Sequence, residues 1–182
     1  MNEFEEKVCY VAKESRVNKE LIAHGWPHTI QVIEYAKMIV RSIDASLEED
    51  VIIAAAFHDV SRVDDECDPT HGVRSAEIAQ KLIPKYFPEA DLKSILFAIK
   101  HHCDFEAQGG GVPVVANYDL RNGINPIIAM CLWDGDRLDL LRLQDHPVIY
   151  TEYLNTDFAK SYANSEEHMK RYKSKNYRNN FS

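Results

Sequence analysis

The sequence predicts an all-α fold, a single-domain helical bundle, and three observations support that prediction. The chain has 182 residues, 45% of them apolar, which is enough to bury one substantial core. Glycine and proline are few, at seven each, and no internal repeat is evident. Most apolar residues recur at helical spacing rather than alternating as in strands. We expect a helical domain over residues 1–163 and a basic C-terminal tail over residues 164–182.

The first two helices are each indicated by one apolar face. Residues 3–15 carry apolar side chains along a single stripe. Gly25 ends the following segment, and Pro27 suits the first turn of the next helix. His28 shares a face with the apolar residues of that helix, so its imidazole should point into the core. A core histidine hydrogen-bonded to a backbone carbonyl is the ordinary explanation for His28 taken alone.

The third helix carries the segment around which the chain is organised. Ser46 and Glu49 form a potential capping box at its start. Residues 51–57 are apolar throughout, too long a run for a surface, and His58 and Asp59 follow directly. Burying an imidazole beside a carboxylate is costly unless each is paired or bound to a cation. An isolated His-Asp pair more often closes a helix, so a metal site here depends on further candidate ligands.

Two later helices bring more histidines inward. A charged loop ends at Pro69, and His71 then precedes a helix that stops before Pro88. On the following helix His102 lies on the apolar face and His101 on the adjacent one, so His102 is the better inward candidate. The segment 103–125 contains three consecutive glycines, and both a lid over a site and a plain loop remain open for it.

The last strongly apolar helix begins at Asn125-Pro126 and holds two candidate carboxylates. Asp134 and Asp136 lie on different faces, and periodicity does not decide between them. Gly135 between them costs about 1 kcal/mol in a helix interior, which indicates close packing against another backbone or an adjustment at a site. One or two short helices after residue 147 would close the bundle.

Charge and composition exclude several classes of partner. The net charge is -8, and because residues 164–182 carry +3, the body carries -11. An acidic body argues against duplex nucleic acid as the main partner. No apolar run has the length of a membrane span and the N-terminus is acidic, so we expect no membrane partner and a cytoplasmic protein. The four cysteines form no C-x-x-C pair, and although Cys67 and Cys103 lie near candidate ligands in sequence, structural thiols are the expectation.

Together these helices direct a set of imidazoles and carboxylates inward. The set comprises His28, His58, Asp59, His71, His102 and one of Asp134 and Asp136. Imidazole with carboxylate suits iron, manganese, zinc, cobalt or nickel, and it suits an all-oxygen magnesium cage poorly. One or two divalent transition metal ions are therefore the expected cofactors.

The order H, then HD, then D resembles that of the HD-domain superfamily of metal-dependent phosphohydrolases. The similarity covers about residues 25–141: His28 matches the first ligand, His58-Asp59 the paired ligands, and Asp136 in G-D-R-L-D the terminal aspartate, which favours it over Asp134. The segments D-P-T-H-G and C-L-W-D-G-D-R-L-D-L look more specifically like an uncharacterised bacterial HD subgroup with an HD…DP-x-HG…WDADRLDL-like pattern.

The resemblance implies a phosphohydrolase that uses a metal-activated hydroxide on a small phosphorylated substrate, such as a nucleotide. In binuclear members an additional histidine binds metal or phosphate, so His71 and His102 would complete a second metal site. Asp59 would bridge two metals, or on a mononuclear site would both bind the metal and orient the attacking water. His71 and Arg62 would hold the phosphate, and pairing of Arg62 with Asp64 or Asp65 on the loop remains equally open. Cyclic-di-GMP cleavage is not expected, because Cys103 stands where the cleaving members have Glu and no G-Y-P follows.

Two functions of other classes also remain open from the sequence. A di-iron, oxygen-activating HD-fold oxygenase would use the same ligand types, and oxygen uptake with iron would identify it. A non-catalytic nucleotide-binding domain would bind metal and release no phosphate. The substrate, the identity of the metal and the oligomeric state carry no recognisable motif.

Overall fold

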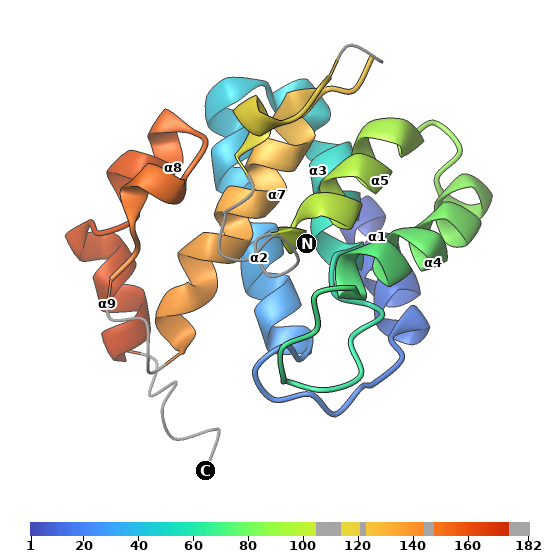
Figure 1. Cartoon of the computed structure of the whole chain (residues 1–182), viewed down its shortest axis with the longest axis horizontal. Coiled ribbons are helices and arrows are strands. Elements are labelled where there is room, and N and C mark those ends of the chain that lie inside the picture. Colours follow the sequence, from blue (N-terminus) through green and yellow to red (C-terminus); the bar gives the residue numbers. More distant parts are fainter. Residues whose placement is uncertain (105–113, 121–122, 144–147, 175–182) are drawn as a thin grey trace.

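A computed structural model describes residues 1–104, 114–120, 123–143 and 148–174 (Figure 1). Within these ranges all regular secondary structure is helical and no strand occurs, so the all-α prediction is confirmed. None of the helices in the described part of the chain is both long and apolar enough to cross a membrane. Much of the glycine-rich segment within 103–125 lies outside the described residues, as does the end of the tail from residue 175.

The centre of the molecule consists of α2 (Trp26–Ile43), α3 (Glu48–Phe57) and α7 (Pro126–Leu138), which contact one another. Every residue from 51 to 57 of α3 is buried, as the unbroken apolar run predicts. α1 (Glu3–Ser15) packs against α3. This arrangement places the end of α3 inside the bundle, together with His58 and Asp59, which follow it.

The other helices lie on opposite sides of this centre (Figure 1). α4 (His71–Tyr86) and α5 (Leu92–His101) pack together, and α5 also contacts α3 and α7. α8 (Asp157–Tyr162) and α9 (Glu166–Ser174) lie on the far side from α4. Short 3-10 turns connect the helices: η1 (Ala45–Leu47), η2 (Val115–Asn117), η3 (Asp139–Arg142) and η4 (Thr151–Tyr153).

Local sequence signals account for most helix starts. The Asn2 side chain accepts a hydrogen bond from the N–H of Glu5 at the start of α1, and Asn125 caps α7 just before Pro126. The predicted capping box at Ser46 is wrong, because α3 begins after Leu47 without a side-chain cap. Asp44 caps η1 instead and accepts from both the N–H and the hydroxyl of Ser46, which removes that hydroxyl from α3.

Two glycines permit the backbone contacts that bring site residues together. A Cβ on Gly135 would lie 3.1 Å from both Ala36 N and Val32 O, so α7 approaches the backbone of α2 as closely as the sequence predicts. A Cβ on Gly72 would lie 2.7 Å from Lys100 O, so the start of α4 presses on the end of α5. Any larger residue at position 72 would force these two helix ends apart.

Candidate metal centre

Asp59 is the residue around which the candidate centre is built. It lies in the turn that follows α3, is 2% exposed, and presents its two carboxylate oxygens to different groups of histidines. Its Oδ2 lies 3.7 Å from His28 Nε2 and 3.5 Å from His58 Nε2. Its Oδ1 lies 3.1 Å from His71 Nε2 and 3.5 Å from His102 Nε2. The carboxylate thus stands between two pairs of imidazoles.

The first group consists of His28, His58 and Asp136 and joins α2, α3 and α7. His28 Nε2 lies 3.3 Å from His58 Nε2 and 3.3 Å from Asp136 Oδ1. The two carboxylates that periodicity could not separate have different surroundings, because Asp134 accepts hydrogen bonds from Asn155 and Thr156 at the start of α8. Asp136 therefore lies in the group and Asp134 lies outside it.

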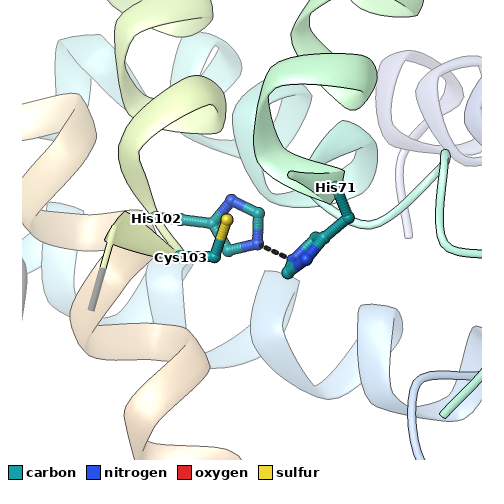
Figure 2. A group of neighbouring side chains, drawn as sticks. All are labelled: His71, His102 and Cys103. Atoms are coloured by element: carbon teal, nitrogen blue, oxygen red, sulfur yellow. Dashed lines mark hydrogen bonds between the residues drawn. The ribbon is translucent and has the colours of Figure 1, made fainter. Parts of the chain in front are cut away.

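The second group consists of His71, His102 and Cys103 and joins the start of α4 to the end of α5 (Figure 2). His71 Nε2 and His102 Nε2 are 2.8 Å apart. The Cys103 thiol belongs to the same group, in which all ligand atoms lie within 4.8 Å of one another. His101 points elsewhere and binds the Asp104 carboxylate at 2.7 Å, so the inward residue of the pair is His102, as the sequence predicts.

The outer nitrogens of these histidines determine what the inner ones can do. Nδ1 of His58, His71 and His102 contacts a backbone carbonyl, from Ala55, Asp68 and Ile99 respectively. Nδ1 of His28 contacts the Asp139 carboxylate at 2.7 Å. Carbonyl and carboxylate oxygens only accept, so each Nδ1 carries the proton and each neutral ring has a lone pair on Nε2.

Facing lone pairs are the observation that tests whether these residues fit a metal. Two acceptor nitrogens at 2.8 or 3.3 Å repel unless a proton or a cation lies near both. Two ligands bound to one ion at about 2.1 Å are themselves separated by roughly 3 Å. The Nε2 and carboxylate spacings around Asp59 are of this size, so both groups fit a divalent ion with nitrogen and oxygen ligands.

Burial and neighbouring charges shift the pKa values of these carboxylates and imidazoles. Burial raises the pKa of Asp59, but the surrounding histidines outweigh it and hold that pKa well below its ordinary value. Burial likewise opposes ionisation of Asp136, and His28 lowers its pKa. Burial lowers the pKa of His71, whereas Asp59 and Cys103 raise it to a net value of about 10. Burial lowers the pKa of His102 to about 4.

Arg62, a predicted phosphate contact, lies beside Asp59 and is 4% exposed. Its Nε is 3.5 Å from Asp59 Oδ1 and has no hydrogen-bond partner within the described residues. Its guanidinium also donates to the Glu66 carbonyl. In this conformation the guanidinium partly balances the negative charge of Asp59.

Sequence patterns did not identify two residues that lie near the first group. His24 Nδ1 lies 3.2 Å from Asp59 Oδ2, and the side chain is 19% exposed. Asp139 holds His28 and accepts from the Tyr172 hydroxyl at 2.7 Å. A signal existed for each in the sequence spacing, since His24 precedes His28 by four residues and Asp139 follows Asp136 by three. Asp136, with 28% of its side chain exposed, and His24 mark the side of the centre that reaches solvent.

The family follows from a comparison over this same region. The HD domain family model matches residues 25–141, which is more than half of the chain. The chain belongs to the HD domain family. No match was found among the curated proteins or among the solved structures. The HD domain family belongs to a superfamily of metal-dependent phosphohydrolases, and the His and Asp groups of this chain could hold metal ions.

Proposed function

We propose that this HD protein is a metal-dependent phosphohydrolase that releases phosphate from a nucleotide or a related small phosphoester. Membership of the HD domain family supports the reaction class. The observation that carries the proposal is the pairing of imidazole lone pairs on either side of one buried carboxylate. A purely structural core would have no reason to bury four imidazoles around Asp59 with their acceptor atoms turned toward one another.

We assign two divalent ions to this arrangement. The first would be held by His28, His58, Asp136 and the Oδ2 of Asp59. The second would be held by His71, His102 and the Oδ1 of Asp59. The distances between these atoms support the assignment. In the first set the other three ligand atoms lie within 4 Å of His28 Nε2, and in the second set both imidazoles lie within 4 Å of Asp59 Oδ1. The backbone carbonyls and Asp139 would keep the rings oriented for binding.

Metal ions in such sites lower the pKa of a bound water from about 15.7 to roughly 7 and stabilise charge on phosphoryl oxygens. The protein's own groups would then do three things. Asp59 would stay ionised and so hold both ions, because its pKa is lowered. Arg62 would compensate negative charge beside Asp59 Oδ1. The partly exposed edge at His24 and Asp136 would be the side from which the phosphoester enters.

The test compares phosphate release by the wild type, Asp59→Asn and Asp64→Asn. Asp64 is an exposed aspartate on the loop after Asp59, so its substitution is a matched control. Nucleoside mono-, di- and triphosphates and simple phosphoesters would be screened with manganese, iron, cobalt and zinc. We expect wild-type turnover that falls at least about 100-fold in Asp59→Asn, while Asp64→Asn stays near wild type.

Absence of phosphate release from the whole panel with every metal would overturn the proposal. Equal turnover by wild type and Asp59→Asn would also overturn it. Oxygen consumption by the iron-loaded protein without phosphate release would instead assign the centre to oxygen activation.

A further inference from the structure

The second group of histidines has a neighbour to which no role has yet been given. The Cys103 thiol lies at the end of α5, and its Sγ and one ring nitrogen each of His71 and His102 lie within 4.8 Å of one another (Figure 2). The side chain is buried, with 8% exposure. Within the described residues its polar contact to the backbone is a weak one, to the Pro69 carbonyl at 3.8 Å. The thiol thus lies beside the imidazole pair.

The fold makes room for this thiol at the position next to His71. A Cβ on Gly72 would lie 2.9 Å from Cys103 Sγ, closer than real Cβ atoms come. The glycine that allows α4 to meet α5 therefore also leaves the space that the sulfur occupies. The other three cysteines differ, because Cys9 and Cys131 are buried among apolar residues and Cys67 is exposed on a loop.

The facing nitrogens of His71 and His102 are a second observation, separate from the thiol, that favours a bound cation at this point. His71 Nε2 and His102 Nε2 approach to 2.8 Å, and Asp59 Oδ1 lies 3.1 and 3.5 Å from them. Two imidazoles and one carboxylate give three ligands, and a tetrahedral ion takes a fourth. The Cys103 thiolate, which lies beside both imidazoles, would complete that set from the protein alone.

We propose that Cys103 is a thiolate ligand of the second metal ion, together with His71, His102 and Asp59. This inference rests on the proposed two-metal centre and deepens it. A set of two nitrogens, one oxygen and one sulfur favours zinc, cobalt or iron(II) over manganese and magnesium. The first set has only nitrogen and oxygen ligands, so the two halves of the centre would differ in metal preference. Binding replaces the thiol proton, which leaves to solvent, and requires no oxidant.

The test is titration of metal-free protein with cobalt(II), followed by absorption in the near ultraviolet. A thiolate bound to cobalt gives a charge-transfer band there that imidazole and carboxylate ligands do not. The proteins would be the wild type, Cys103→Ser, Cys103→Ala and Cys67→Ser. Cys67→Ser is the matched control, because it removes an exposed thiol from the preceding loop. Circular dichroism would establish that each variant is folded.

We expect the band in wild type and Cys67→Ser and its loss in both Cys103 variants. In competition titrations the preference of the second site for zinc over manganese should fall about tenfold or more without Cys103. A second cobalt ion bound without the band, a band that persists in both Cys103 variants, or no second ion at all would each overturn the inference. If one Cys103 variant does not fold, the other and the wild-type spectrum decide.

Phosphate release measured on the same samples separates this inference from the proposed function. Turnover without any thiolate band would refute the role of Cys103 and leave the hydrolase in place. A Cys103-dependent band in a protein that hydrolyses no phosphoester would support the ligand and refute the hydrolase.

Discussion

Four histidines around Asp59 each bind a protein oxygen with Nδ1 and turn Nε2 toward the carboxylate: His28, His58, His71 and His102. Sequence patterns predicted that His28, His58, His71 and His102 would point inward, but they could not predict the hydrogen bond on the far side of each ring. Those partners are three backbone carbonyls and Asp139. Backbone carbonyls have no sequence signature, so this aspect of the site could be seen only in the structure.

The choice between Asp134 and Asp136 was equally beyond helical periodicity. Both lie near the end of α7, and family resemblance alone favoured Asp136. The structure gives the physical difference: Asp134 is fully buried and accepts four hydrogen bonds from two consecutive residues, Asn155 and Thr156. It ties α7 to the segment before α8, while Asp136 faces His28.

This difference predicts opposite phenotypes for two neighbouring substitutions. Asp134→Asn should lower the free energy of unfolding by about 2–4 kcal/mol, because an amide NH₂ cannot accept from buried donors. It should leave metal content unchanged under conditions where it is folded. Asp136→Asn should remain stable within about 1 kcal/mol when metal-free and lose metal from the first group. Urea denaturation and elemental analysis measure both effects, and the reverse pattern would contradict the assignment.

At the scale of elements, the centre is made from helix ends. His28 lies in the first turn of α2, His58 and Asp59 follow α3, His71 begins α4, and His102 follows α5. Helix starts and ends were predictable where proline or a capping side chain marks them, as at Asn125-Pro126. The start of α3 was mispredicted because Asp44, two residues upstream, competes for Ser46. Gly135 was predicted to pack closely, whereas the equal role of Gly72 at the α4–α5 contact was not.

The loop before α4 provides a prediction about pH. Arg74 pairs with Asp68 and lowers the pKa of that carboxyl to about 2, from an ordinary value of 3.8. A lowered pKa in the folded state means that the stabilisation is present above the ordinary pKa and is lost as pH falls toward 2. The pair is partly exposed, so its contribution should be about 1 kcal/mol or less.

The measurement is the difference in unfolding free energy between wild type and Asp68→Asn as a function of pH. We expect a constant difference above pH 5 that shrinks between about pH 4 and pH 2. A difference that grows on acidification would show that Asp68 is not stabilised by Arg74. The Asp68 carbonyl that accepts from His71 is retained in this variant, so the second group keeps its ring orientation.

At the scale of the whole molecule, the site depends on segments that are far apart in sequence. Asp139, at the start of η3, links His28 of α2 to Tyr172 of α9, and Arg142 Nη1 lies 3.4 Å from the same carboxylate. His168 of α9 is fully buried, with its ring against the Leu138 carbonyl. We propose on these contacts that residues 164–174 belong to the same folded unit as the centre, although the sequence shows them only as part of a basic tail.

The helical fold and its identity as an HD domain were predictable because apolar periodicity and a spaced set of His and Asp are properties of the sequence. The division of the candidate ligands into two groups was not, since it depends on which oxygen of Asp59 each helix end faces. Cys103 illustrates the limit most clearly. Its proximity to His102 in sequence said little, and only the approach of α4 to α5 places it beside His71.

We propose that two divalent metal ions bind on opposite oxygens of Asp59. The most direct test is a crystal structure of the metal-loaded protein with anomalous diffraction collected at the absorption edge of the metal. We predict two anomalous peaks, one near His28, His58 and Asp136 and the other near His71 and His102, with Asp59 between them. Diffraction from fully loaded crystals that shows no peak beside Asp59, with the metal bound at other residues, would contradict the account.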